Sequence, residues 1–188
     1  DSDSNEYQIT YTFQKQSTSS STTELEGTWK SSCYASSSYY YIDTVTISGT
    51  GMVYKFEGHN DSNCSTDNYT QEWTYSDLSI GDALTYESGT KTGAKFTMII
   101  SGATETQNSS HDLSWVNNNS YCGYSDWQLN VAKDITGKTC GSTTYASANT
   151  KIFSVYKNES SSSIHLGSFN LEATGYPSGV NSIELTKQ

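Results

Sequence analysis

Arginine is absent from the 188-residue sequence, and proline occurs only once. All ten basic residues are lysines, and with 20 acidic residues the formal net charge is −10. Because nucleic-acid binding needs a cationic surface that displaces counterions from phosphate, this balance argues against a nucleic-acid partner. It also disfavours docking on an anionic membrane, and the lack of arginine removes the usual bidentate clamp for phosphorylated ligands.

Long apolar runs are also missing. No segment approaches the roughly 18 consecutive apolar residues that a transmembrane helix requires, so no transmembrane segment is expected. The sequence starts with DSDSNEY and without methionine, which predicts that a targeting segment has been removed. A lipid anchor on a cysteine preceding residue 1 would be one way of tethering such a protein.

Cysteine is scarce, but its spacing is informative. No two cysteines are close enough for a CxxC metal knuckle, so a zinc site is not expected. An even number in two natural intervals predicts two disulfides and a secreted, periplasmic or outer-surface location. Three pairings can be drawn, and we prefer the sequential one because it closes the shortest loops. It joins Cys33 to Cys64 and Cys122 to Cys140.

Aromatic residues compensate for a modest hydrophobic content. The chain contains 15 Tyr, 5 Phe and 4 Trp, and tyrosine supplies large apolar area together with a hydroxyl that tolerates water. Helical periodicity is weak, whereas apolar and polar residues alternate in about ten short segments separated by turn signals. This pattern predicts an all-β sandwich or barrel. The expected strands include 39–47, 52–58, 69–75, 94–101, 111–115, 150–156, 163–173 and 181–187.

The first 24 residues differ from the remainder. Tyr7, Ile9, Tyr11 and Phe13 share one face of a predicted N-terminal strand, and a linker rich in serine and threonine follows. We therefore divide the chain into this segment, residues 1–24, and a β-barrel domain, residues 25–188.

The stretch LEGTWKSSC, residues 25–33, indicates which barrel this is. Gly27 and Trp29 open a strand that ends at Cys33, and this resembles the G-x-W signature of lipocalins and other calycins. The resemblance implies an antiparallel lipocalin-like β-barrel of about 8–10 strands, with the extra N-terminal strand outside it. Trp29 would pack across the closed base, where an arginine of the last strand usually covers it. This sequence has no arginine, so that half of the signature is missing. Lys187 is the only cation placed for that role.

A longer pattern extends the resemblance over residues 25–90. After Cys33 come a predicted hairpin, TVTISGTGMVYKFEG, and a polar loop that contains Cys64. This order is similar to that of uncharacterised secreted or lipid-anchored bacterial proteins. It is also similar to the repeated barrel domain of an animal Wnt antagonist, adenomatosis polyposis coli down-regulated 1. The resemblance implies that a disulfide between these cysteines pins the first strands of the barrel together.

Signals for catalysis are weak. The sequence has no G-x-S-x-G elbow, and its three histidines are His59, His111 and His165. His111 and Asp112 are neighbours, but adjacent residues of a strand point to opposite faces. We therefore expect no enzyme activity and no cofactor.

Two acidic segments alternate oxygen-bearing side chains as calcium loops do. Neither carries the glycine and terminal glutamate of an EF-hand, so ordinary turn chemistry is the expectation and no metal site is predicted. The segments comprise Asp1, Asp3 and Asn5, and Asp61, Asn63, Ser65 and Asp67.

The inward-facing aromatics suggest a function. In a barrel of this size, inward residues either form a filled core or line a cavity for one small ligand. Together with the resemblance, this leads to the hypothesis of non-catalytic binding or transport of a small hydrophobic or amphipathic molecule. The candidate ligand-binding residues are Tyr54, Phe56, Trp73, Tyr75, Phe96 and Met98.

Two other hypotheses remain open. The loop from Trp115 to Trp127, with Tyr121 and Tyr124, is dense in aromatics and amides, as glycan- or protein-binding loops often are. A filled, dry interior would instead indicate a structural or adhesion subunit without a small ligand.

Overall fold

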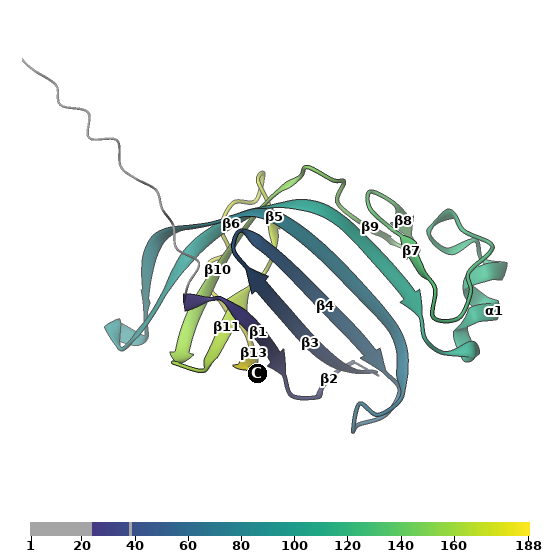
Figure 1. Ribbon diagram of the computed structural model, residues 1–188, viewed down its shortest axis with the longest axis horizontal. Helices are drawn as coiled ribbons and strands as arrows, with labels where there is room; N and C mark the ends of the chain where they lie inside the picture. Colours follow the sequence, from purple (N-terminus) through teal and green to yellow (C-terminus); the bar gives the residue numbers. More distant parts are fainter. Residues whose placement is uncertain (1–23, 38) are drawn as a thin grey trace, which may run out of the picture.

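Eight antiparallel strands form a closed barrel in the computed structural model, which describes residues 24–37 and 39–188 (Figure 1). Each ring strand pairs with the next along the chain, and pairing of β13 with β1 closes the ring. The predicted all-β barrel is therefore confirmed, whereas the N-terminal strand around Tyr7–Phe13 lies outside the described residues. The ring strands are β1 (Gly27–Ser31), β3 (Tyr39–Ser48), β4 (Gly51–His59), β5 (Asp67–Tyr86), β6 (Lys91–Gln107), β10 (Lys151–Ser160), β11 (Ser163–Gly167) and β13 (Val180–Lys187).

Short elements outside the ring gather mainly at the far end of β6, where Figure 1 shows α1 beside β7, β8 and β9. None of the helices among the described residues is long and apolar enough to cross a membrane. These elements are β2 (Tyr34–Ser36), the 3₁₀ turns η2 (Glu87–Gly89) and η3 (Tyr121–Gly123), α1 (Ser110–Asn118), β7 (Ala132–Asp134), β8 (Thr139–Cys140), β9 (Thr143–Thr144) and β12 (Asn170–Leu171).

Helix α1 corrects the strand predicted over 111–115. Ser109 precedes the helix in an extended conformation, and its hydroxyl accepts a hydrogen bond from the backbone N–H of His111. Serine is a favoured N-cap because it satisfies one of the unpaired N–H groups of the first turn. Only Val116 of the helix is buried, so the apolar pattern is too sparse to indicate a helix from sequence.

The base of the barrel is closed by Trp29, as the resemblance implied. Its side chain is 2% exposed, and its indole N–H donates to the carbonyl of Leu25 at 2.8 Å. The Nζ of Lys187 lies 5.2 Å from the ring centroid, which confirms that this lysine takes the covering position. Gly27 has φ +117°, and a Cβ there would lie 3.0 Å from the Lys187 side chain, so the glycine leaves room for this contact.

Both disulfides have the predicted sequential pairing. Cys33 after β1 joins Cys64 in the loop between β4 and β5, with Cα atoms 5.8 Å apart. Cys122 in η3 joins Cys140 in β8. The first bond ties the first strands of the ring together, and the second fixes the segment beside α1.

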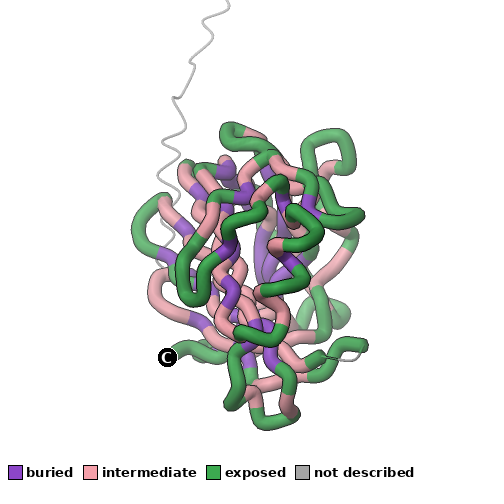
Figure 2. Tube along the Cα trace, turned by 90° about the vertical axis from the view of Figure 1, so that its right-hand side faces the viewer, coloured by how far each residue is buried: buried purple, intermediate pink, exposed green. Residues whose placement is uncertain are grey.

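The interior contains two hydrophobic clusters, and Figure 2 shows buried segments inside exposed turns. The larger cluster surrounds Trp29 at the base and fills the barrel with residues such as Met52, Phe96 and Leu185. The smaller one lies under the α1 and β8 segments, around Trp127. The core thus occupies the base and one flank, and the other end of the barrel is left for a cavity.

Candidate functional site

Among the described residues, the barrel contains a larger and a smaller cavity that share no lining residue. The larger has a volume of 630 Å³ and lies where β3 and β5 begin and β6 ends, next to α1; we call it the mouth cavity. The smaller has a volume of 140 Å³. Known small-molecule sites span roughly 300–1,000 Å³, so only the mouth cavity has the usual size. Its lining residues are Tyr39, Tyr41, Asn68, Tyr69, Gln71, Glu105, Gln107, Asp112, Trp115, Val116, Tyr121 and Tyr145.

Strand pairing places the polar floor of the mouth cavity. Gln71 lies opposite Glu105, and Tyr69 lies opposite Gln107, in the pairing of β5 with β6. Directly opposed residues of an antiparallel pair share a face, and every second residue returns to it. The same face carries Trp73 and Ala103 one step deeper, so this row of polar groups lies directly above the packed core.

Glu105 is the buried carboxylate of this floor and is only 3% exposed. Its two oxygens accept hydrogen bonds from the side-chain amides of Gln71 and Gln107, each at 2.7 Å. The Gln71 amide also reaches the hydroxyl of Tyr145 at 2.7 Å. Burial raises the pKa of Glu105, and hydrogen bonds from these amides and from Tyr121 only partly offset that effect.

The raised pKa of Glu105 makes a prediction about stability and pH. The folded protein holds this proton more tightly than the unfolded chain does, so stability falls as the pH rises from the unfolded pKa through the folded one. Glu105→Gln removes this loss. We expect the free energy of unfolding of the variant, relative to the parent, to be larger at pH 7 than at pH 4, as measured by urea denaturation at both values. A difference independent of pH would contradict it.

Aromatic rings and one unpaired amide complete the mouth cavity. Trp115 of α1 and Tyr39 of β3 form its rim, with side chains 55% and 46% exposed. The Trp115 ring lies 5.9 Å from that of Tyr121. Asn68 is 4% exposed, and its amide oxygen has no hydrogen-bond partner among the described residues, which is costly for a buried polar atom. The site therefore offers ring faces at its opening and hydrogen-bonding groups below.

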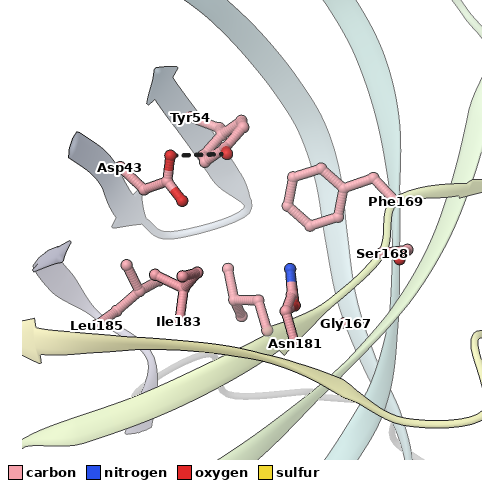
Figure 3. A pocket seen from close by; sticks show the side chains of 9 residues that line it. Asp43, Tyr54, Gly167, Ser168, Phe169, Asn181, Ile183 and Leu185 are labelled. Atoms are coloured by element: carbon pink, nitrogen blue, oxygen red, sulfur yellow. Dashed lines mark hydrogen bonds between the residues drawn. The ribbon is translucent and has the colours of Figure 1, made fainter. Parts of the chain in front are cut away.

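The smaller cavity lies beside Asp43 (Figure 3). The carboxylate of Asp43 accepts hydrogen bonds from the hydroxyls of Tyr54 and Tyr34, both at 3.1 Å. Burial raises the pKa of Asp43, and the two hydroxyls lower it in part. Figure 3 shows Phe169 facing this pair, with Asn181 on the opposite wall. A cavity of this size suits a few ordered waters better than a ligand.

The six predicted ligand-binding residues do not line the mouth cavity. Tyr75, Phe96 and Met98 are buried in the packed core, with exposures of 6%, 1% and 1%. Tyr54 lines the smaller cavity, and Trp73 stacks on it at a centroid distance of 5.6 Å. The sixth residue, Phe56, stacks on Tyr41, which itself lines the mouth cavity, at 4.6 Å.

The predicted aromatic loop is divided between surface and core. Trp127 is 2% exposed and belongs to the smaller hydrophobic cluster. Tyr124 packs edge-on against it and is covered by Lys133 and Lys138, whose Nζ atoms lie 4.8 and 4.6 Å from its ring centroid. Trp115 and Tyr121 line the mouth cavity instead. The loop therefore forms one wall of a pocket and not a four-ring platform.

The Asp61 loop folds as a turn. The Asp61 carboxylate accepts hydrogen bonds from the backbone N–H groups of Asn63, Ser65 and Thr66. These bonds, with the one from Ser65 largest, lower the pKa of Asp61 to about 2. The residues that the structure describes contain no group of three or more His, Cys, Asp or Glu able to hold a metal ion. The second acidic segment, Asp1–Asn5, lies outside them.

The expectation that His111 and Asp112 point apart is wrong. Both lie in α1, not in a strand, and the His111 Nδ1 lies 2.8 Å from a carboxylate oxygen of Asp112. The His111 side chain is 87% exposed and lies at the surface, whereas Asp112 is 37% exposed and also lines the mouth cavity.

Sequence reasoning also missed Glu105 and Gln107, because the polar stretch that contains them is typical of a loop. Strand β6 continues to Gln107, and alternation of Ala103, Glu105 and Gln107 is the signal that could have shown it.

A closed eight-strand antiparallel barrel with a cavity at one end is consistent with a lipocalin-like architecture. Neither a comparison with protein-family models nor one with curated protein sequences finds a match for the chain.

Proposed function

We propose that this protein binds a small amphipathic molecule, without catalysis, in the mouth cavity of its barrel. The observation that supports this most is the 630 Å³ cavity, which combines six aromatic residues with buried amides and the buried carboxylate of Glu105. Ring faces remove the flat apolar parts of a ligand from water, and a few convergent polar groups fix its orientation. The ligand is expected to be amphipathic because Phe96 and Met98 already fill the apolar interior.

Transport outside the cytoplasm extends this proposal. Two disulfides fit an oxidising compartment, in keeping with a secreted, periplasmic or lipid-anchored carrier. The resemblance to secreted bacterial barrels and to the animal Wnt-antagonist domain stays a prediction.

Glycan binding at the rim is the second candidate. Trp115 is the observation that favours it, because its ring is 55% exposed beside amides that could hydrogen-bond sugar hydroxyls. Either ligand would use the same cavity, so one experiment addresses both.

Two measurements test the proposal. The first is native mass spectrometry of unreduced protein from a cellular host, and the second is fluorescence titration with aromatic alcohols, fatty acids and oligosaccharides. We expect Trp115→Ala to weaken binding about tenfold, or ~1.4 kcal/mol, because it removes an aromatic wall at little cost to folding. Tyr176→Ala is the matched control, since this exposed ring packs on Phe153 and does not line the cavity. No ligand with any probe, or equal effects of both variants, would contradict the proposal.

A further inference from the structure

The mouth cavity has an unbalanced charge. Glu105 and Asp112 both line it, and no lysine or histidine of the described residues does so. Asp112 has His111 beside it at 2.8 Å, so the imbalance rests on Glu105. Among the described residues, the hydrogen-bond partners of Glu105 are the neutral amides of Gln71 and Gln107 and the hydroxyl of Tyr121. A buried carboxylate without a cation is costly, and an ion pair with a bound cation would recover part of that cost. With no arginine in the chain and a net charge of −10, anionic ligands are disfavoured there.

Hydrogen-bonding capacity in the cavity is also one-sided. The amide N–H groups of Gln71 and Gln107 already donate to Glu105. The amide oxygen of Asn68, a residue that is only 4% exposed, accepts no hydrogen bond from the part of the chain that the structure describes. An acceptor of this kind calls for an N–H or O–H donor from a ligand. The cavity therefore fits a molecule that donates hydrogen bonds.

Ring faces add a third, independent feature. Six aromatic residues line the same cavity: Tyr39, Tyr41, Tyr69, Trp115, Tyr121 and Tyr145. The faces of such rings carry negative electrostatic potential and attract cations within about 6 Å of the centroid. The same rings also stack on flat apolar groups.

We infer that the ligand is an organic amine, whose ammonium group lies against Glu105 and donates to Asn68 while its apolar body stacks between Trp115 and the tyrosines. This inference rests on the proposed function, since it assigns a ligand class to the same cavity. It differs from the glycan alternative in requiring a positive charge.

Matched probes of one shape test the charge requirement. 2-Phenylethylamine, 2-phenylethanol and 3-phenylpropionate are titrated into the full chain at pH 7 by calorimetry and tryptophan fluorescence. We expect the amine to bind at least about tenfold more tightly than the alcohol, and the carboxylate to bind most weakly. Raising the salt concentration should leave most of this preference in place, because a buried pair is poorly screened.

Glu105→Gln should abolish the tenfold preference for the amine over the alcohol, because the amide carries no charge that could pair with an ammonium group. Glu72→Gln is the matched control, because it removes the same charge from the neighbouring strand. Glu72 alternates with the inward Gln71 and lies opposite Lys55 and Thr104, away from the cavity. If the variant failed to fold, the comparison of the three probes on the parent protein would still decide the question.

Three outcomes would overturn the inference. The first is equal binding of amine and alcohol, the second is tighter binding of an oligosaccharide than of the amine, and the third is an unchanged preference in Glu105→Gln. Each of them would exclude an ammonium site, while binding at the mouth cavity would stand. Absence of binding by every probe, together with a ligand-free native mass, would overturn both the amine class and the proposed function.

Discussion

Trp29→Ala is expected to lower the free energy of unfolding by about 3–5 kcal/mol, the usual cost of deleting a fully buried aromatic side chain. Trp29 is 2% exposed, donates a hydrogen bond to Leu25 and lies under Lys187. Its loss leaves a void where the last strand meets the first. The expected loss is large because the whole free energy of unfolding of a domain is only about 5–15 kcal/mol. Urea denaturation followed by circular dichroism would measure the change.

Trp115→Ala provides the control for that measurement. It removes the same side chain from a helix surface where it is 55% exposed, so a loss below about 1 kcal/mol is expected. Similar losses for the two variants would show that Trp29 does not anchor the base.

Gly93→Ala is expected to destabilise the barrel by about 3 kcal/mol, because overpacking against a backbone cannot be relieved by a side-chain rotation. A Cβ on Gly93 would be driven into the carbonyl oxygen of Tyr156. Gly93 lies opposite Lys157 in the pairing of β6 with β10. The added methyl would separate these two strands, and the urea midpoint and the binding of a hydrophobic dye would report the opening.

Gly179→Ala is the matched control for Gly93→Ala. No atom lies within 4 Å of a Cβ placed there, and its φ is outside the positive range. Its effect should stay within about 0.5 kcal/mol. If Gly93→Ala were equally harmless, the close approach of β6 and β10 would not constrain the barrel.

Much of the barrel was predictable because its causes are local. Alternation with a period of two marked β3, β4, the first half of β5 and the middle of β6, since each presents one face to the core. The G-x-W signature predicted the base, including the cover by Lys187 that the structure shows at 5.2 Å. Cysteine intervals predicted both disulfides.

The mouth cavity could not be predicted, because contacts between distant parts of the chain create it. Gln71 meets Glu105 across 34 residues and Tyr145 across 74 residues. A buried glutamate has no local sequence signature, and α1 depends on one serine cap in a polar segment. Inward aromatics such as Phe96 were visible as a face, but whether that face is packed or open depends on the whole barrel.

Strand order around the ring is the same as strand order along the chain, and β13 returns to β1. The backbone N–H of Gln188 donates to the carbonyl of Thr28 at 2.9 Å, so the two ends of the ring lie side by side. A closed meander of this kind has no obligatory first strand. If these ends were joined and the chain were opened at an exposed turn such as Glu87–Gly89, each strand could still pair with the same two neighbours, except that β5 and β6 would no longer be joined by a turn. The fold is therefore well suited to circular permutation, with new ends placed far from the cavity.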